Sequence, residues 1–314
     1  MLTSELIEAV RAKTDEDNTN DLSSAKIIAA LNRALQRLAR LSVRHYPELL
    51  RRTTADTALT GSTLTLPAMS QAYHQLSVDA KYGSTYRTLS YTSTANVAGM
   101  DRTDSTSSYP MYYTQSGNIL SFYPQSTASV RVRYQLKPPE LVLEQGRIVD
   151  FDIALGYVYL DTIGTGLSTS VSDRTAFFNI IDQFTGDIKA TLQVNSLTTA
   201  SGRIVIKTTG LGRTNVYGWD VVTALPDTIA KDDLVCLAKG SCMPLYFREY
   251  TDFLLQFAVN DIKSTFGTKT EMDAYDLKDV EEDVKLMWSQ RPYGARIKQN
   301  NPVWNAATFR RPRR

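Results

Sequence analysis

The stretch YYTQSGNILSFYPQSTASVRVRYQLKPPEL, residues 112–141, decides how this 314-residue chain is organised. A Ser-Gly-Asn turn at 116–118 joins two runs rich in aromatic and β-branched residues, which predicts a β-hairpin. Residues 130–137 then alternate apolar side chains with polar ones, three of them basic, the pattern of a strand with one buried face. Two prolines at 138–139 end this sheet region, because proline lacks the N–H that a strand interior needs.

The chain does not return to helix after these prolines. Residues 144–240 have no helical period, and Gly and Ser/Thr clusters separate short runs of strand-forming residues. This pattern predicts an all-β sandwich or barrel. The expected strands are residues 148–153, 157–160, 177–181, 188–194, 203–207, 221–224 and 234–238.

Helices are expected at the N-terminal end of the chain. Residues 3–13 favour a short helix, and Ser23 or Ser24 can cap a longer one that Pro47 ends. The longer helix has one apolar face at three- and four-residue steps, made of Ile28, Leu31, Leu35 and Leu38.

Helices are expected again near the C-terminal end. An aromatic and aliphatic stripe runs from Tyr250 to Ile262, and Gly267 is placed to end that helix. Thr270 can cap a last helix, whose apolar side is Leu277, Val280, Val284, Met287 and Trp288. Neither terminal pair buries its stripe alone, so the two pairs are expected to pack together.

The chain is therefore predicted to be an α+β protein. A helical bundle is formed from both chain ends and carries a β-hairpin and sheet region, and an all-β domain is inserted into it. The expected parts are the first part of the core at residues 1–143, the inserted β domain at 144–240, the closing core helices at 241–290 and an extended basic tail at 291–314.

Arginines form a stripe along the longer N-terminal helix. Their spacings of four, three and four place the guanidinium groups on one side, at Arg33, Arg37, Arg40 and Arg44. Such a stripe is either a solvated cationic face or a face turned towards a polyanion.

Charge is also uneven at the C-terminal end. Residues 271–283 are strongly acidic, whereas residues 291–314 carry only basic charges. This asymmetry predicts an interaction tail, with two large apolar residues, Trp304 and Phe309, among its arginines.

Signatures of enzymes, cofactors and metals are missing from the sequence. No nucleophile elbow or zinc-protease motif occurs, and the glycine pairs at 164–166 and 210–212 lack the Lys-Ser/Thr of a phosphate loop. Residues 15–21 resemble a calcium loop but place Asn20 and Lys26 where Gly and Glu are needed. Cys236 and Cys242 have no further Cys or His ligands nearby. We therefore expect a non-enzymatic protein without cofactor or metal.

No apolar run approaches the roughly 20 residues of a membrane span, and the first residues have no apolar signal region. No membrane association is expected, and the chain is expected to be made in a cytosol.

The order of these parts resembles the head-to-tail connector (adaptor) proteins of tailed bacteriophages. The closing helices are also similar to those of the tail tubular protein A of short-tailed phages. The matching segments are LIEAVR (6–11), IIAALNRALQRL (27–38), YPEL (46–49), the hairpin with GNILSFYP (117–124), VRVRYQLKPPEL (130–141), FREYTDFLLQFA (247–258) and FGT (266–268). They cover about two-thirds of the chain and leave out residues 144–240.

The resemblance implies a ring, commonly of twelve subunits, in the neck of the virion. Such a ring is assembled in the host cytoplasm, joins the portal protein to the tail tube or nozzle and lets genomic DNA pass through its lumen. A C-terminal tail that docks on the portal is implied, with its contacts at Trp304, Phe309, Arg310, Arg311, Arg313 and Arg314. The arginine stripe is then a candidate for the channel lining or for the contact with the acidic segment of a neighbouring subunit.

The inserted β domain departs from the family pattern. It can widen the collar, dock tail fibres or spikes, or bind a glycan through aromatic residues such as Tyr217 and Trp219. We favour a protein dock. The rival hypotheses are a tail component whose β domain binds or hydrolyses carbohydrate, and a cellular nucleic-acid-binding protein that uses the arginine helix and the basic tail. A steep salt dependence of duplex DNA binding, or release of sugars, would distinguish them.

Overall fold

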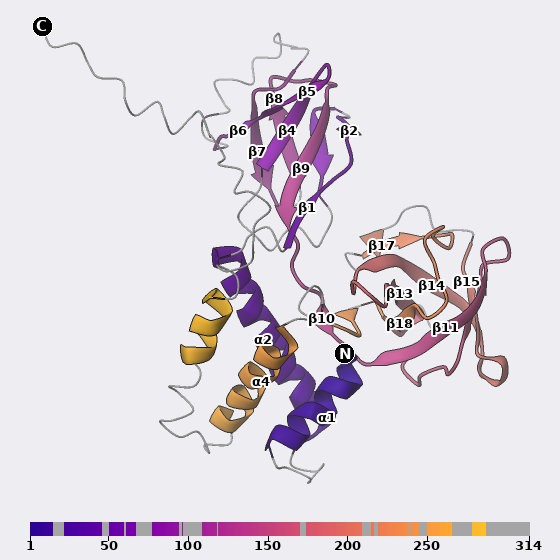
Figure 1. Cartoon of the computed structure of the whole chain (residues 1–314). Coiled ribbons are helices and arrows are strands. Elements are labelled where there is room, and N and C mark those ends of the chain that lie inside the picture. The colour runs from indigo at the N-terminus through magenta and orange to yellow at the C-terminus, as the bar shows by residue number, and fades with distance from the viewer. Residues whose placement is uncertain are drawn as a thin grey trace, which may run out of the picture.

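A computed structural model of the chain describes residues 1–14, 22–45, 50–59, 61–66, 77–93, 96, 109–117, 119–169, 174–208, 215–216, 219–238, 240–244, 250–265 and 278–286. These residues form a helical bundle, a pair of small sheets above it and a β-barrel at its side (Figure 1). The fold is mixed α+β, as predicted, with helices from the two chain ends packed together.

The bundle is built around one long amphipathic helix. Helices α1 (Thr3–Thr14) and α4 (Thr251–Thr265) and a helical segment at residues 278–286 pack on α2 (Ser24–His45) (Figure 1). Leu31, Leu35 and Leu38 of α2 are buried as predicted, while Ile28 is only partly buried. Val280 and Val284 of the C-terminal segment join the same apolar cluster. The bundle core therefore depends on residues from both ends of the chain.

Two small sheets face each other above the bundle. One consists of β1 (Arg51–Thr53), β2 (Thr57–Ala58), β4 (Ser77–Tyr82), β5 (Thr85–Thr88) and β9 (Ser129–Gln135). The other consists of β3 (Thr63–Thr65), β6 (Ser90–Tyr91), β7 (Tyr112–Ser116) and β8 (Ile119–Tyr123). The predicted hairpin is β7–β8, and Gly117 takes the left-handed φ of 61° at its turn. Val130 and Val132 of the alternating strand pack with Phe122 of the facing sheet.

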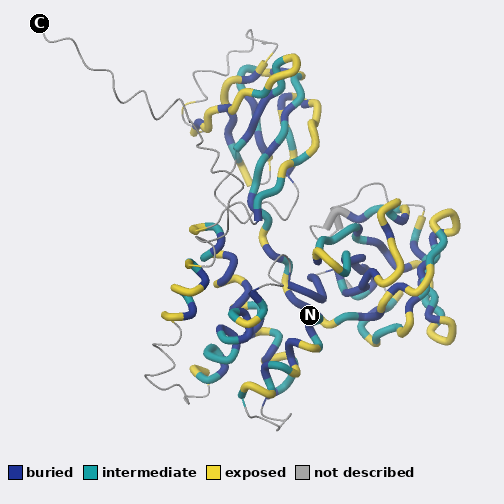
Figure 2. Tube along the Cα trace, viewed as in Figure 1, coloured by how far each residue is buried: buried dark blue, intermediate teal, exposed yellow. Residues whose placement is uncertain are grey.

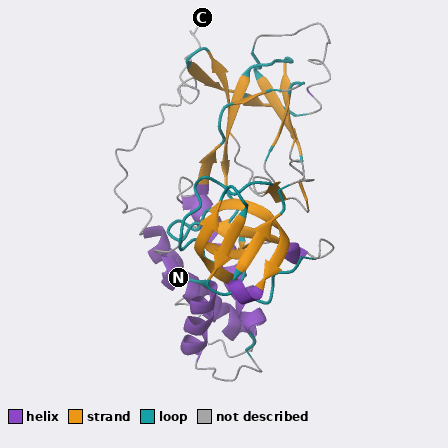
Figure 3. Ribbon diagram, turned by 90° about the vertical axis from the view of Figure 1, so that its right-hand side faces the viewer, coloured by secondary structure: helices purple, strands orange, loops and turns teal. Residues whose placement is uncertain are grey.

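The strands of residues 144–240 close into a barrel, seen end-on in Figure 3. Closure follows from β13 (Phe177–Ile181), which pairs with both β14 (Ile188–Thr198) and β18 (Leu234–Leu237). The remaining wall strands are β11 (Glu144–Asp152), β12 (Tyr157–Leu160) and β15 (Arg203–Ile206). A short hairpin of β16 (Asn215–Val216) and β17 (Trp219–Val222) extends from β14. Each expected strand corresponds to one of these elements, and closure removes the exposed edges of an open sheet.

Strand β13 is buried on both faces, which explains its unbroken apolar run. Phe178 and Ile180 lie in the barrel core, whereas Phe177 and Ile181 belong to separate clusters outside it. The cluster that contains Ile181 also holds Cys242 and Met243, with Leu2 packed against it. One strand therefore joins the barrel interior to its contact with the bundle. The barrel strands next to the bundle are drawn mostly in the dark blue of buried residues in Figure 2.

The chain leaves and re-enters the bundle through two adjacent strands. β10 (Glu140–Leu141) and β19 (Gly240–Ser241) pair in parallel, although a hundred residues of sequence separate them. The side chain of Asn32 on α2 accepts from Leu141 N at 2.6 Å and donates to Leu141 O at 3.2 Å. On the other side, the N–H and the hydroxyl of Thr3 donate to Cys242 O at 2.9 and 3.0 Å. That residues 144–240 form an insertion domain stays a prediction, with this strand pair at its two boundaries.

Gly240 tests the importance of the strand pair. A Cβ at this position would lie 2.0 Å from the carbonyl oxygen of Glu140, so Gly240→Ala must push β10 and β19 apart. We expect the free energy of unfolding to fall by roughly 2–3 kcal/mol, in the upper range for single substitutions. Urea unfolding of the full chain, followed by circular dichroism, measures this change.

Gly83→Ala is the matched control. Gly83 has a φ of 61° with no atom within 4 Å of its Cβ position, so the substitution adds only backbone strain of about 1 kcal/mol. Equal losses from the two variants would show that the β10–β19 contact contributes no special stability.

Candidate functional site: the assembly surfaces

The arginine stripe of α2 is divided in two by its partners. Arg33 donates to Asp261 of α4 from Nε at 2.8 Å and from a terminal nitrogen at 2.5 Å. Arg37 donates in the same way to Glu281 at 3.0 and 2.6 Å, and its guanidinium lies 5.0 Å from the ring centroid of Phe257. These two arginines therefore tie α2 to the C-terminal helices of their own subunit.

Arg40 and Arg44 continue the stripe beyond these pairs. Both side chains are exposed, and neither makes a hydrogen bond or ion pair to another residue within the described ranges. Partial burial, then the charges of Arg44 and Lys285, lower the pKa of the adjacent His45. The exposed guanidinium groups of Arg40 and Arg44, with Lys285 close to His45, make this end of α2 a cationic surface.

The basic residues of β9 are paired within their own sheet. Arg131 and Arg133 lie 3.0 and 2.8 Å from the carboxylate of Asp79, which is almost fully buried. The guanidinium of Arg131 also lies 3.5 Å from the ring centroid of Tyr86. This network fixes the outer face of the sheet and leaves Arg40 and Arg44 as the more accessible cations.

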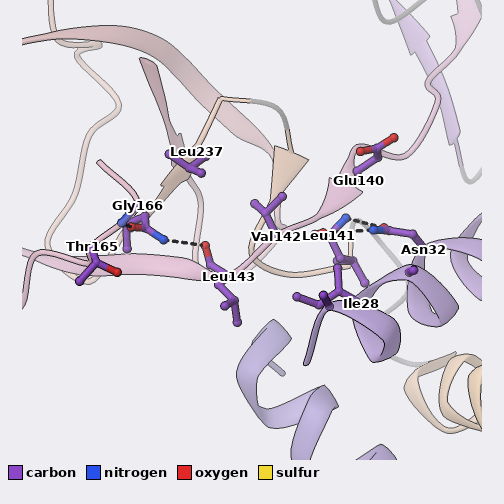
Figure 4. Close-up of a pocket in the computed structure, with 12 residues that line it drawn as sticks. Ile28, Asn32, Glu140, Leu141, Val142, Leu143, Thr165, Gly166 and Leu237 are labelled. Atoms are coloured by element: carbon purple, nitrogen blue, oxygen red, sulfur yellow. Dashed lines mark hydrogen bonds between the residues drawn. The ribbon is translucent and has the colours of Figure 1, made fainter. Parts of the chain in front are cut away.

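A cleft opens where α2, β10 and the barrel meet (Figure 4). It measures about 490 Å³, and small residues of α2, Ala25 and Ala29, form one wall together with Ile28. The lining residues from the strands and the barrel are Glu140, Leu141, Val142, Leu143, Gln145, Thr165, Gly166 and Leu237. This cleft has no signature in the sequence, because its walls come from distant segments.

The turn between β13 and β14 presents an aromatic residue to solvent. Phe184 is 72% exposed, yet its backbone is held firmly. Asp182 Oδ1 accepts from the N–H groups of Phe184 and Thr185, each at 2.9 Å, and Thr185 Oγ1 accepts from Asp187 N at 3.2 Å. Arg52 of β1 lies 3.5 Å from Asp187 and links the turn to the neighbouring sheet.

Charge at this turn is balanced by neighbouring residues of the barrel strands and loops. Burial would raise the pKa of Asp182, but the two backbone hydrogen bonds and the ammonium of Lys189 outweigh it and lower the pKa to about 2. Lys189 also lies 2.9 Å from the buried carboxylate of Asp233. The exposed phenyl ring therefore sits on a turn that is braced by ion pairs at its base.

Several predicted contacts lie outside the described residues. These are the tail residues Trp304, Phe309, Arg310, Arg311, Arg313 and Arg314, and the aromatic Tyr217. Trp219 is described in its backbone, at the start of β17. Of the acidic segment, residues 278–283 are described, and there Glu281 binds Arg37 of its own chain.

The sequence contained a signal for the Phe184 turn that was not used. The segment DQFTGD, residues 182–187, places Asp and Gly around an apolar residue between two expected strands. In contrast, nothing in the sequence spacing indicated Asp261 as the partner of Arg33.

Within the described ranges, no helix is long and apolar enough to cross a bilayer. No group of three or more Cys, His, Asp or Glu residues in those ranges is arranged to hold a metal ion.

Comparison with known proteins identifies the class. The family model of the SU10 adaptor protein, a phage adaptor or head–tail connector, matches residues 1–163 of the chain. The match spans more than half of the 314 residues, so the chain belongs to the SU10 adaptor protein family. It runs through β12 and so includes the first two barrel strands, which the resemblance seen in the sequence left out. No curated protein matches the chain.

Family membership gives the general role. The chain is a structural adaptor protein of a phage and a component of the virion, and an adaptor binds other virion proteins.

The division of the arginine stripe has a measurable consequence. The double substitution of Arg33 and Arg37 by Gln removes two ion pairs between α2 and the C-terminal helices. We expect the free energy of unfolding to fall by roughly 1 kcal/mol at low salt and by less at high salt, because the pairs are partly exposed. The same change at Arg40 and Arg44 should leave stability unaltered. A larger loss from the second variant than from the first would contradict this division.

Because the pKa of Asp182 is lowered in the folded protein, the free energy of unfolding should depend on pH in the acid range. The ordinary value is 3.8 and the folded value is about 2, so the contribution is present above pH 3.8 and is lost as the pH falls towards 2. The loss should amount to about 2 kcal/mol in the free energy of unfolding. Asp182→Asn should remove this part of the pH dependence, measured by urea unfolding between neutral and acid pH. Asp227→Asn, at an exposed position of the same region, should retain it.

Proposed function

We propose that this adaptor forms a ring between the portal protein and the tail tube or nozzle, and that the ring encloses the channel through which DNA leaves the head. Family membership supports the connector role. The observation that carries the channel is the pair Arg40 and Arg44, exposed cations on the long helix that lack a partner among the described residues. The ring is proposed to hold twelve subunits.

A DNA channel needs sparse, mobile cations on its surface. Regular arginine–phosphate contacts along the whole stripe would bind the duplex tightly, because each contact releases condensed counterions. Such tight binding would hinder the passage of the DNA. Arg33 and Arg37 are occupied by Asp261 and Glu281, so fewer guanidinium groups of α2 remain to meet phosphates. This arrangement fits a surface that reduces repulsion along a sliding polyanion without holding it.

The basic tail at residues 291–314 is proposed to dock on the portal. Trp304 and Phe309 would supply apolar anchors, and the arginines at 310, 311, 313 and 314 would pair with carboxylates of the partner. Ring formation would bring many such tails to one portal, which raises their combined affinity.

The barrel is proposed as the attachment point for tail fibres or spikes. It projects to one side of the bundle (Figure 1), and its β11–β12 hairpin exposes three aliphatic residues, Val149, Ile153 and Leu155. Exposed apolar groups gathered on one hairpin are typical of a protein contact.

The experiment is to mix the purified chain with the portal protein of the same phage and to image the complexes by negative stain. We expect rings seated on the portal, and a chain truncated after residue 299 should lose them. A chain that binds no portal, with or without its tail, would overturn the proposed connector ring.

Arg40→Gln with Arg44→Gln tests the channel. If these residues line the lumen, rings should form normally and genome release from variant particles should slow. Loss of ring assembly would instead place them at a subunit contact. Arg147→Gln, which removes an exposed cation of the barrel, is the matched control and should change neither assembly nor release.

A further inference from the structure

The cleft beside α2 has the properties of a site for one bulky apolar side chain (Figure 4). Its volume of about 490 Å³ is within the range of roughly 300–1,000 Å³ that ligand pockets occupy. Ala25 and Ala29, one helical turn apart on α2, are exposed and leave the space that larger side chains would fill. Leu143 at its edge is 42% exposed, so apolar surface there is open to water.

The lining of the cleft carries one negative charge. Glu140 is the one charged residue among those that line it, and it is exposed with no ion pair inside the described ranges. A carboxylate attracts cations and accepts hydrogen bonds, whereas the indole N–H of tryptophan is a donor only. The cleft is thus suited to an aromatic side chain that has cationic neighbours.

The C-terminal tail has this composition. Residues 291–314 contain seven Arg and Lys residues and no acid, and Trp304 follows Pro302 and Val303 in a short apolar run. An indole ring that waits for its portal in water has a large apolar surface uncovered, which is unfavourable. A site on the same subunit would cover the ring until the portal is met.

The tail is long enough to reach the cleft of its own subunit. Glu281 binds Arg37, which lies eight positions after Ala29 on α2, or roughly 12 Å along the helix axis. The last described segment ends at residue 286, and residues 287–303 precede Trp304. In an extended form these residues span up to roughly 55 Å, which exceeds the path around α2.

We propose that Trp304 occupies the α2 cleft of its own subunit in the free chain and that the portal displaces it. The basic residues of the tail then lie close to the carboxylate of Glu140. This inference rests on the proposed docking of the tail on the portal, because it gives one anchor two successive sites. The cleft holds the portal anchor in reserve, and a chain docks only after Trp304 has left the cleft.

Tethering makes a weak contact sufficient. A short flexible linker gives the tail an effective concentration on the order of 1 mM at the cleft. A tail segment with a dissociation constant of about 0.1 mM would then fill the cleft in about nine chains of ten. Since only the remaining tenth is competent to dock, the apparent affinity for portal is lowered about tenfold.

Cysteine cross-linking tests the contact in the free full-length chain. Ala25→Cys and Asn305→Cys are introduced into one chain, which is oxidised with diamide and analysed by peptide mass mapping. We expect a disulfide within the chain, and saturating portal added before oxidation should prevent most of it. The native Cys236 and Cys242 are fully buried and should not react.

Ala154→Cys replaces Ala25→Cys in the matched control. Ala154 is an exposed alanine in the turn between β11 and β12 and does not line the cleft, so it should give little cross-link with Asn305→Cys. Equal yields from the two pairs would overturn the contact. A covalent dimer in place of the bond within the chain would place the tail in the cleft of another copy and would also overturn it.

Portal affinity provides a second readout. Ala29→Trp fills the cleft and leaves the tail intact, so it should tighten binding of the full chain to portal about tenfold. Trp304→Ala should weaken that binding, because it removes the anchor. Gln36→Trp, at an exposed position of α2 outside the cleft, is the control for the added indole and should change nothing.

The outcomes separate this contact from the proposed docking. Unchanged portal affinity in Ala29→Trp, with no cross-link in the free chain, would overturn the cleft contact and leave the docking of the tail intact. If the chain truncated after residue 299 binds portal as well as the full chain does, the docking is wrong, and with it the displacement of Trp304 by the portal.

Discussion

The whole structure depends on a short parallel pairing between β10 and β19. The backbone enters and leaves the barrel side by side at this point, and the carbonyl of Glu140 lies so close to Gly240 that no side chain fits between them. Asn32 binds β10 to α2, and Thr3 binds α1 to the residue that follows β19. The two N-terminal helices are therefore held to the strands that enter and leave the barrel by a few hydrogen bonds, made by the Asn32 side chain and by the N–H and hydroxyl of Thr3.

The arginines along α2 have two different roles. Near the middle of the helix, Arg33 and Arg37 contribute to the packing of α4 and of residues 278–286. Towards the end of the helix, Arg40 and Arg44 have no such partner among the described residues, and partial burial together with the charges of Arg44 and Lys285 lowers the pKa of His45. One sequence pattern thus serves the fold in its first half and is open to another molecule in its second half. An adaptor protein needs both, because it must hold its own shape while it binds other virion proteins.

The barrel shows how one strand can serve two cores. Phe178 and Ile180 of β13 face the barrel interior, Ile181 belongs to the cluster that joins the barrel to the bundle, and Phe177 belongs to a separate cluster. The turn that follows it is braced by Asp182 and Lys189, so a buried strand ends in a rigid, exposed Phe184. Residues close together in the sequence therefore have different roles here: Asp182 stabilises the turn, and Phe184 exposes its ring to solvent.

The sequence by itself determined the local elements and the class of the fold. The three- and four-residue steps of Leu31, Leu35 and Leu38 specify a helix face, and the alternation at 130–133 specifies a half-buried strand, since both periods follow from backbone geometry. Further along the same strand the expected alternation fails, because Gln135 is buried. The tertiary structure alone decided which distant residues meet: Arg33 with Asp261, Asn32 with Leu141, and Ala29 with the barrel edge at the cleft. Periodicity is a property of neighbours along the chain, whereas these contacts depend on how the two chain ends and the strands between them are folded together in space.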